Sequence, residues 1–153
     1  MASNPQTTTL TGLTGVARRL GMSYSAERLW DPDYNMTLGS YHLGELMGNF
    51  GGSMLMTTVG YNAGPGRAPQ WVARCGDPRR STEAAIDYIE CAPITETRNY
   101  MMRVMENMSV YKARLNGGTA PLTLSADIAR GTVPTPGAPT APTPYTAYSA
   151  GGN

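Results

Sequence analysis

The sequence predicts an all-α fold of about six helices, and three observations support this prediction. In the longest patterned stretch, apolar residues recur at i, i+3, i+4 and i+7, which is the spacing of one helix face. No segment shows a convincing alternation of apolar and polar residues, the pattern of a half-buried strand. Gly and Pro separate the helical stretches at short intervals, as expected for tight connections between helices.

The N-terminal part predicts the end of a helix followed by a short turn. Residues 16–20 are predicted to end a helix at Gly21, because glycine readily takes the left-handed conformation that closes a helix. Ser25 is expected to cap a short turn that runs through Trp30.

The next two helices are separated by a pair of glycines. Asp31 and Pro32 mark the start of a helix that ends at Gly51 and Gly52. Its apolar positions are predicted to be Met36, Leu43, Leu46, Met47 and Phe50. An apolar helix over residues 53–61 follows, and we expect it to be nearly all buried.

Three further helices are predicted after a break at residues 64–66, which read Gly-Pro-Gly. They cover residues 69–74, a stretch from residue 82 to just before Pro93, and residues 95–115. The apolar face of the last helix is predicted to comprise Met101, Val104, Met105, Met108, Tyr111 and Leu115.

The chain has 153 residues, a length that suits one domain. The predicted organisation is an atypical N-terminal segment over 1–15, a domain over 16–118 and a Pro/Thr/Gly-rich tail over 119–153. From residue 131 onward the sequence has no charged residue and almost no large aliphatic residue. Such a composition cannot bury enough apolar surface to offset the entropy of ordering, so a disordered tail is expected.

Charge and composition argue against several function classes. Twelve Lys+Arg and eleven Asp+Glu give a formal net charge of +1, which disfavours nucleic acid as a partner. Arg74, Arg79 and Arg80 are interpreted as a solvated basic loop. No apolar run approaches the ~20 residues of a membrane-spanning helix. The N-terminus also lacks the charged and apolar regions of a signal peptide.

The two cysteines, Cys75 and Cys91, are too few for a zinc site, and the single histidine, His42, offers no ligand partner. No metal or other cofactor is therefore expected. A disulfide between the two cysteines and a pair of free, buried thiols are both compatible with the sequence.

Two short motifs could line a polar cleft. Residues 61–67 read Tyr-Asn-Ala-Gly-Pro-Gly-Arg, and their glycines allow a sharp turn and the close approach of a ligand to the backbone. Glu96 and Arg98 lie on the first turn of the last predicted helix, where the helix dipole favours a carboxylate. Taken singly, each motif is explained by a helix end or a surface ion pair. Together they suggest two walls of one cleft.

With their flanking sequence, these motifs resemble the SLT domain, the goose-type-lysozyme-like catalytic domain of soluble lytic murein transglycosylases. The resemblance covers residues 16–115 and rests on three stretches, at residues 29–41, 61–67 and 86–100. Gly60 stands where the family usually has alanine, and Tyr88 replaces a tryptophan. The resemblance implies a lysozyme-like helical globule.

The resemblance also implies a function. Family members cleave the β-1,4 bond between N-acetylmuramic acid and N-acetylglucosamine in peptidoglycan, and one glutamate serves first as acid and then as base to form a 1,6-anhydro ring. Tyr61 matches the tyrosine beside that glutamate, and Glu96 matches a second, non-catalytic glutamate of the substrate cleft. Asn62 and Arg98 match positions that hold the shape of the site. Peptidoglycan strands are the implied partner, a monomer is expected, and the implied location is the periplasm or cell envelope.

The sequence departs from the family pattern where the catalytic glutamate is expected, before residue 16. Residues 7–15 contain neither a glutamate nor a glutamine, so the catalytic residue is unknown. Glu27, Glu45 and Glu90 match non-catalytic positions or precede the proline turn. We therefore expect an N-terminally truncated domain that is inactive as written. The alternatives are a non-enzymatic glycan-binding remnant and a helical interaction module.

Overall fold

The computed structural model describes residues 5–133, with side chains described from residue 12 onward. This part of the chain contains helices and no strand, so the predicted all-α fold is confirmed for it. The helices are α1 (Pro5–Arg19), the 3-10 helix η1 (Glu27–Trp30), α2 (Pro32–Asn49), α3 (Met54–Ala63), α4 (Arg67–Cys75), α5 (Thr82–Cys91), α6 (Thr95–Leu115) and α7 (Leu124–Ile128). None of these described helices is both long enough and apolar enough to cross a membrane.

The helix ends follow the capping residues in the sequence. The side chains of Asp31, Ser53 and Ser81 accept hydrogen bonds from backbone N–H groups at the starts of α2, α3 and α5, respectively. Gly21 and Gly52 have φ angles of 67° and 82°, the left-handed conformation that closes a helix. The predicted bounds of α6 are confirmed, whereas α4 begins two residues earlier than predicted.

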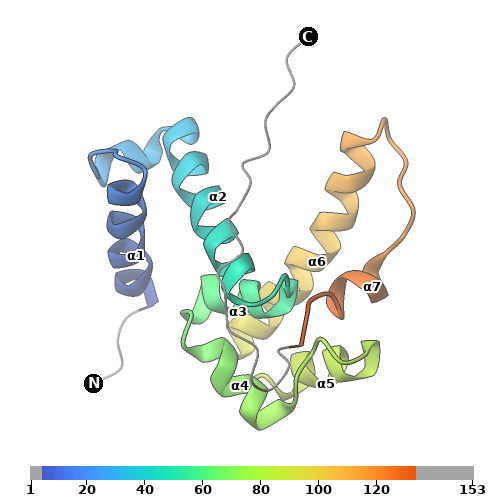
Figure 1. Ribbon diagram of the computed structural model, residues 1–153. Coiled ribbons are helices and arrows are strands. Elements are labelled where there is room, and N and C mark those ends of the chain that lie inside the picture. Colours follow the sequence, from blue (N-terminus) through green and yellow to red (C-terminus); the bar gives the residue numbers. More distant parts are fainter. Residues whose placement is uncertain (1–4, 134–153) are drawn as a thin grey trace.

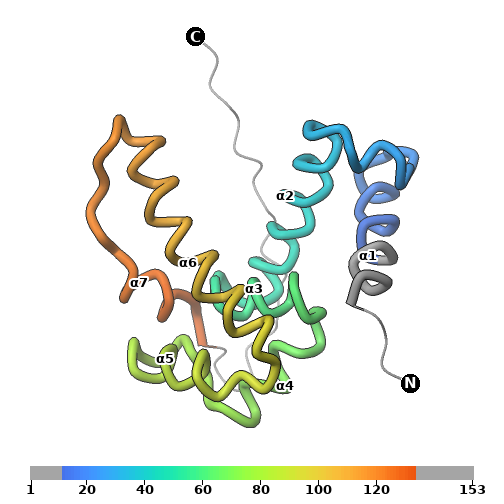
Figure 2. The backbone as a smooth tube through the Cα atoms, turned by 180° about the vertical axis from the view of Figure 1, so that it is seen from behind, coloured from blue at the N-terminus to red at the C-terminus, as the bar shows by residue number. Residues whose placement is uncertain are grey.

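The described helices form two arms that rise from a common base (Figure 1). α1 and α2 lie side by side in one arm, α6 forms the other, and α3, α4 and α5 make the base. The view from behind shows the same arrangement (Figure 2). α3 is the central element because it contacts α1, α2, α4, α6 and α7.

Burial of α3 is nearly complete, as predicted. Residues 55–60 are all buried, and α3 lies within the larger of two hydrophobic clusters. The smaller cluster joins α1 to α2. Its buried members are Leu13, Val16, Ala17, Tyr34 and Leu38.

The predicted apolar face of α2 is wrong in its first half. Leu46 and Phe50 are buried as expected, but the side chains of Met36 and Leu43 are 66% and 41% exposed. Each residue turns a helix by about 100°, so both lie about half a turn from Tyr34, which packs against α1. The contact with α1 therefore selects a different face from the one that the sequence suggested.

The apolar face of α6 is confirmed only in its first half. Met101 and Met105 are buried, and Val104 and Met108 pack against the same cluster. The last predicted members of this face, Tyr111 and Leu115, are 62% and 85% exposed. The end of α6 extends beyond the base, where α3, α4 and α5 do not cover it (Figure 2).

α7 was not predicted, and it lies within residues 119–153, for which the sequence predicts a tail. Ile128 is 8% exposed and belongs to the larger cluster. The buried Asp127 carboxylate accepts hydrogen bonds from the Lys112 ammonium at 2.5 Å and from the Thr123 hydroxyl at 2.7 Å. A helix of five residues is too short to show a helical period in the sequence. Residues 134–153 lie outside the described part of the chain.

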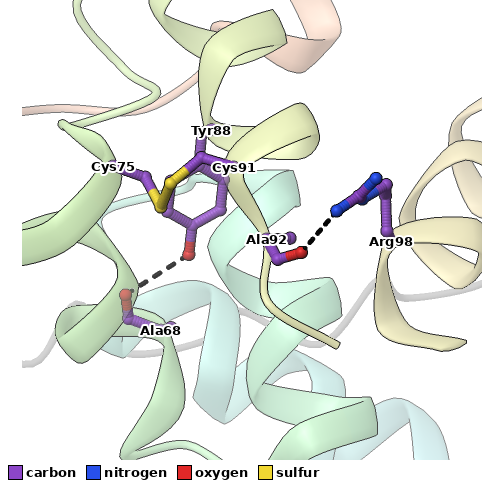
Figure 3. Close-up of a disulfide and its surroundings, with 6 residues drawn as sticks. All are labelled: Ala68, Cys75, Tyr88, Cys91, Ala92 and Arg98. Carbon is purple, nitrogen blue, oxygen red and sulfur yellow. Dashed lines mark hydrogen bonds between the residues drawn. A yellow bond between two sulfur atoms is a disulfide. The ribbon is translucent and has the colours of Figure 1, made fainter. Parts of the chain in front are cut away.

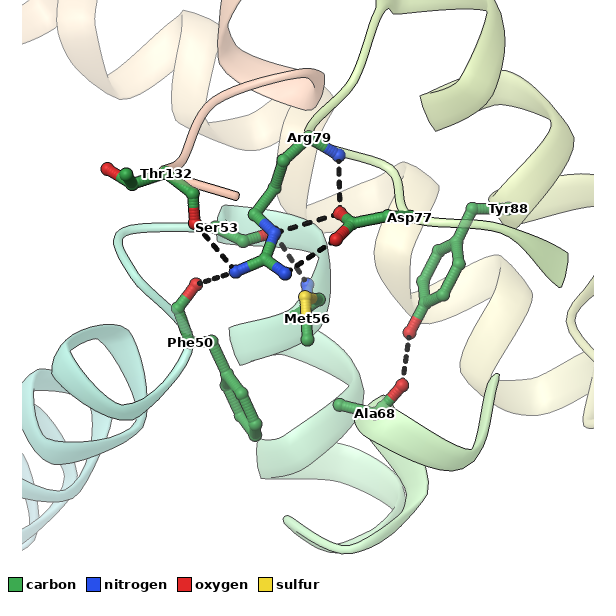
Figure 4. A network of polar contacts seen from close by, with 8 residues as sticks. All are labelled: Phe50, Ser53, Met56, Ala68, Asp77, Arg79, Tyr88 and Thr132. Carbon is green, nitrogen blue, oxygen red and sulfur yellow. Dashed lines mark hydrogen bonds and ion pairs between the residues drawn. The ribbon is translucent and has the colours of Figure 1, made fainter. Parts of the chain in front are cut away.

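Arg79 clamps three distant segments together (Figure 4). Its guanidinium donates to the Asp77 carboxylate at 2.8 and 2.6 Å, and to the backbone carbonyls of Phe50 at 3.3 Å and Thr132 at 2.9 Å. The Arg79 and Asp77 side chains are 7% and 9% exposed. Hydrogen bonds from Arg79 are the main cause that lowers the pKa of Asp77. The prediction of a solvated basic loop is therefore wrong for Arg79, which a buried carboxylate and two carbonyls hold in place.

Replacing Arg79 should strongly destabilise the fold. An Arg79→Leu substitution would leave the buried Asp77 carboxylate unpaired, and we expect the free energy of unfolding to fall by about 3 kcal/mol in urea denaturation. Arg80→Leu is the matched control, because Arg80 is exposed, and it should cost less than about 0.5 kcal/mol. Equal losses in the two variants would contradict the clamp.

Candidate functional site

The two sequence motifs meet in one cavity of about 340 Å³. One wall comprises the end of α3, the following turn and the start of α4, and the other is the start of α6. The lining residues are Asn62, Ala63, Gly64, Pro65, Gly66, Arg67, Gln70, Ile94, Glu96 and Thr97. The pocket is thus formed by segments about thirty residues apart in the sequence.

A direct hydrogen bond joins the two walls. The Thr97 hydroxyl donates to Asn62 Oδ1 at 2.7 Å, and Thr97 is 1% exposed. Gly64 allows the chain to leave α3 beside this bond, since its φ of 102° is one that residues with a side chain rarely adopt. Asn62 uses its amide oxygen in this bond, so its amide nitrogen is not engaged by Thr97.

The mouth of the pocket carries charges of both signs. Arg67, on the exposed side of α4, donates to the Gln70 side chain at 3.4 Å. Glu96 lies on the opposite wall, exposed in the first turn of α6. A carboxylate in that position is favoured by the dipole of the long helix. The pocket therefore offers a cation, a carboxylate and amide groups within one opening.

Tyr61 does not line this pocket. Its partly buried ring lies 5.8 Å, between centroids, from that of His42 on α2. Burial is the main cause that raises the pKa of Tyr100, and the interaction with Tyr61 adds to it. Tyr61 and Tyr100, one from each motif, therefore interact outside the pocket lining.

Arg98 does not line the pocket either. Its Nη2 donates to the backbone carbonyl of Ala92 at 2.8 Å (Figure 3). This bond holds the segment that leads from α5 into the pocket wall. Of the four predicted site residues, Asn62 and Glu96 line the cavity, whereas Tyr61 and Arg98 support the elements around it.

A polar cluster beside Tyr61 was not predicted as a group. The Arg19 guanidinium binds the Glu45 carboxylate at 2.6 Å, and His42 Nδ1 lies 3.9 Å from that carboxylate. Burial is the main cause that lowers the pKa of His42; the charge of Arg19 acts in the same direction and Glu45 opposes it. The sequence singled out His42 only as a metal ligand without partners. The i, i+3 spacing of His42 and Glu45 could have revealed this contact.

The glutamates considered as catalytic substitutes lie elsewhere. Glu45 is committed to its ion pair with Arg19, and Glu27 and Glu90 are exposed on η1 and α5. None of the three lines the cavity. Among the described residues, no group of three or more His, Cys, Asp or Glu side chains could hold a metal ion.

A disulfide joins Cys75 to Cys91, which resolves the choice that the sequence left open (Figure 3). It links the last residue of α4 to the last residue of α5, with 5.7 Å between the two Cα atoms. The Tyr88 hydroxyl, one helical turn before Cys91, donates to the Ala68 carbonyl at 3.3 Å. α4 and α5 are therefore joined by two links, the disulfide at their last residues and the Tyr88–Ala68 hydrogen bond.

Comparison with known proteins identifies the family. The model of the Transglycosylase SLT domain family matches residues 4–84, more than half of the chain. The chain therefore belongs to the SLT transglycosylase domain family, and the predicted family is confirmed. The match begins within the segment over residues 1–15 that the sequence sets apart as atypical. No solved structure matches the chain at a significant level.

Two curated relatives show the extent of the similarity. The chain is 29% identical over 102 residues to the soluble lytic murein transglycosylase of Escherichia coli strain K12, covering 67% of this chain and 15% of that protein. It is 28% identical over 85 residues to the soluble lytic murein transglycosylase of Salmonella typhimurium, covering 56% of this chain and 13% of that protein. The chain thus corresponds to a small part of these relatives.

The bond between the walls should contribute measurably to stability. Thr97→Val preserves the shape of the side chain but removes the donor to Asn62, so we expect a loss of about 1 kcal/mol in the free energy of unfolding. Thr95→Val, at the exposed start of the same helix, is the matched control and should cost little. If the two variants lose the same stability, the bond does not join the walls.

The lowered pKa of His42 predicts a dependence of stability on pH. As pH falls below the ordinary value of 6.5, the unfolded chain takes up a proton on this histidine before the folded chain does, so stability decreases. His42 is the only histidine, so His42→Gln should reduce the loss of stability between about pH 7.5 and about pH 5.5. Urea denaturation at both values measures this. An equal loss in wild type and variant would contradict the assignment.

Proposed function

We propose that this chain forms a saccharide-binding part of a lytic transglycosylase domain and binds the glycan strands of peptidoglycan. The observation that carries the proposal is the meeting of both family motifs in one cavity. A volume of about 340 Å³ lies within the range of small-molecule sites. That space suits one or two sugar rings of a glycan strand.

The lining groups suit an N-acetylated sugar. Glu96 can accept hydrogen bonds from sugar hydroxyls, and Arg67 can donate to a carbonyl or a carboxylate. Because Asn62 Oδ1 accepts from Thr97, the Asn62 amide nitrogen is the group that can donate to a ligand. N-acetylmuramic acid carries hydroxyl, amide and carboxylate groups, which these three side chains complement.

We infer that the pocket serves binding rather than bond cleavage. A general acid that cleaves a glycosidic bond near neutral pH must keep its proton, which requires apolar surroundings. Glu96, the carboxylate among the pocket-lining residues, is exposed. We therefore expect this chain to bind glycan without forming 1,6-anhydro products. We assign no catalytic residue.

The disulfide supports a location in an oxidising compartment. Disulfides persist in the periplasm and outside the cell, and are rare in the reducing cytosol. The Cys75–Cys91 bond therefore agrees with the periplasmic or cell-envelope location that a peptidoglycan substrate requires.

A helical interaction module is the second candidate, and one observation favours it. Large apolar side chains are exposed at the ends of the two arms, among them Trp30 at 91% and Leu115 at 85%. A chain that stays monomeric in sedimentation velocity and binds no apolar dye would argue against this candidate.

Titration with a purified GlcNAc–MurNAc tetrasaccharide tests the proposed function. We expect saturable binding by NMR, with the largest shifts at residues 62–67 and 94–97. Glu96→Gln replaces a charged acceptor by a weaker neutral one, so it should weaken binding about fivefold, which corresponds to about 1 kcal/mol. Glu90→Gln, on the exposed surface of α5, is the matched control and should bind like wild type. Absence of binding at millimolar ligand would overturn the proposal.

A second assay separates binding from cleavage. Incubation with purified cell walls, followed by mass spectrometry of the soluble products, should yield no 1,6-anhydro sugars. Their appearance would overturn the inferred lack of catalysis but would leave the binding proposal intact.

A further inference from the structure

The Cys75–Cys91 disulfide joins the two helices that lead to opposite walls of the pocket. α4 begins in the pocket with Arg67 and Gln70 and ends at Cys75. α5 ends at Cys91, and the chain then enters the other wall at Ile94. The disulfide is therefore a covalent link between the supports of both walls.

Close contacts connect the disulfide to the pocket on both sides. On the side of α4, the Tyr88 hydroxyl donates to Ala68 next to Arg67, and the Tyr88 and Trp71 rings lie 6.5 Å apart. On the other side, the buried Ala92 follows Cys91 directly, and its carbonyl accepts the bond from Arg98 (Figure 3).

Other contacts keep the fold together without the disulfide. The Arg79 clamp holds the loop between α4 and α5, and both helices belong to the larger hydrophobic cluster. In contrast, Pro93 and Ile94, between Ala92 and α6, are exposed. Together with the Arg98–Ala92 bond, the disulfide thus restrains how this short segment enters the pocket wall.

We propose that the Cys75–Cys91 disulfide positions the pocket walls, so that its reduction weakens saccharide binding while the fold persists. This inference rests on the proposed function for its ligand. Both cysteines are partly exposed, so a soluble dithiol can reach them. The dithiol supplies two electrons and two protons; the bond between the cysteine sulfurs breaks to give two thiols, and the dithiol becomes a disulfide.

The experiment compares the oxidised chain with the chain reduced by dithiothreitol, at a temperature where both are folded. The Ala92 amide donates to the Ile89 carbonyl and the Arg98 amide to the Ile94 carbonyl. Hydrogen exchange of these two amides should become about tenfold faster on reduction, while amides at residues 12–20 stay unchanged. The dissociation constant of the GlcNAc–MurNAc tetrasaccharide should rise about tenfold, within the range typical of coupled sites. The Cys75→Ser/Cys91→Ser double variant should match the reduced chain and should not respond to dithiothreitol.

The outcomes show whether the disulfide positions the pocket walls or only stabilises the fold. A lower melting temperature with unchanged affinity and unchanged exchange of the Ala92 and Arg98 amides would overturn the proposal, as would global unfolding on reduction. If the double variant fails to fold, the reduced wild-type chain still provides the comparison. If the oxidised chain binds no tetrasaccharide, the proposed function fails, whereas the exchange measurement still tests whether the disulfide orders the wall.

Discussion

The nearly complete burial of α3 is the constraint on which the rest of the structure depends. A helix with buried residues in every direction must be covered on all sides, and here α1, α2, α4, α6 and α7 share that task. Gly60 shows how tight the cover is, because a Cβ atom at this position would lie 2.7 Å from the Phe50 ring. The alanine that the family usually has there would therefore clash with Phe50. Asn62, which lines the pocket, follows two residues after this close contact.

Local chemistry made part of the fold predictable. Asp31 and Ser53 cap the helices that they precede, and Gly52 ends α2, because these effects depend on a few neighbouring residues. The first half of the predicted apolar face of α2 was wrong because the contact with α1 decides which side of that half is covered. Arg79 was taken for a solvated residue because its carbonyl partners, on Phe50 and Thr132, are far away in the sequence. The sequence offers no local signal for such a contact.

In the candidate site, too, some features could be predicted from the sequence and others depend on contacts that the sequence does not reveal. That the two motifs face each other followed from the family resemblance, and the Asn62–Thr97 bond gives this a physical form. The sequence did not reveal that Tyr61 and Arg98 lie outside the cavity, since a motif does not specify the direction of its side chains. The state of the two cysteines was open for a similar reason: sixteen residues of separation fit a disulfide or two thiols equally well.

The pocket also depends on parts of the chain that do not line it. Its second wall follows a short connection between α5 and α6, and residues 93–96 are exposed. A segment with so few buried neighbours is ordered by the restraints at its ends. One end is held by the Arg98–Ala92 bond beside Cys91, and the other by Thr97 bound to Asn62. A residue such as Arg98 can therefore matter for ligand binding without contacting the ligand, because it fixes the path of the backbone that presents Glu96.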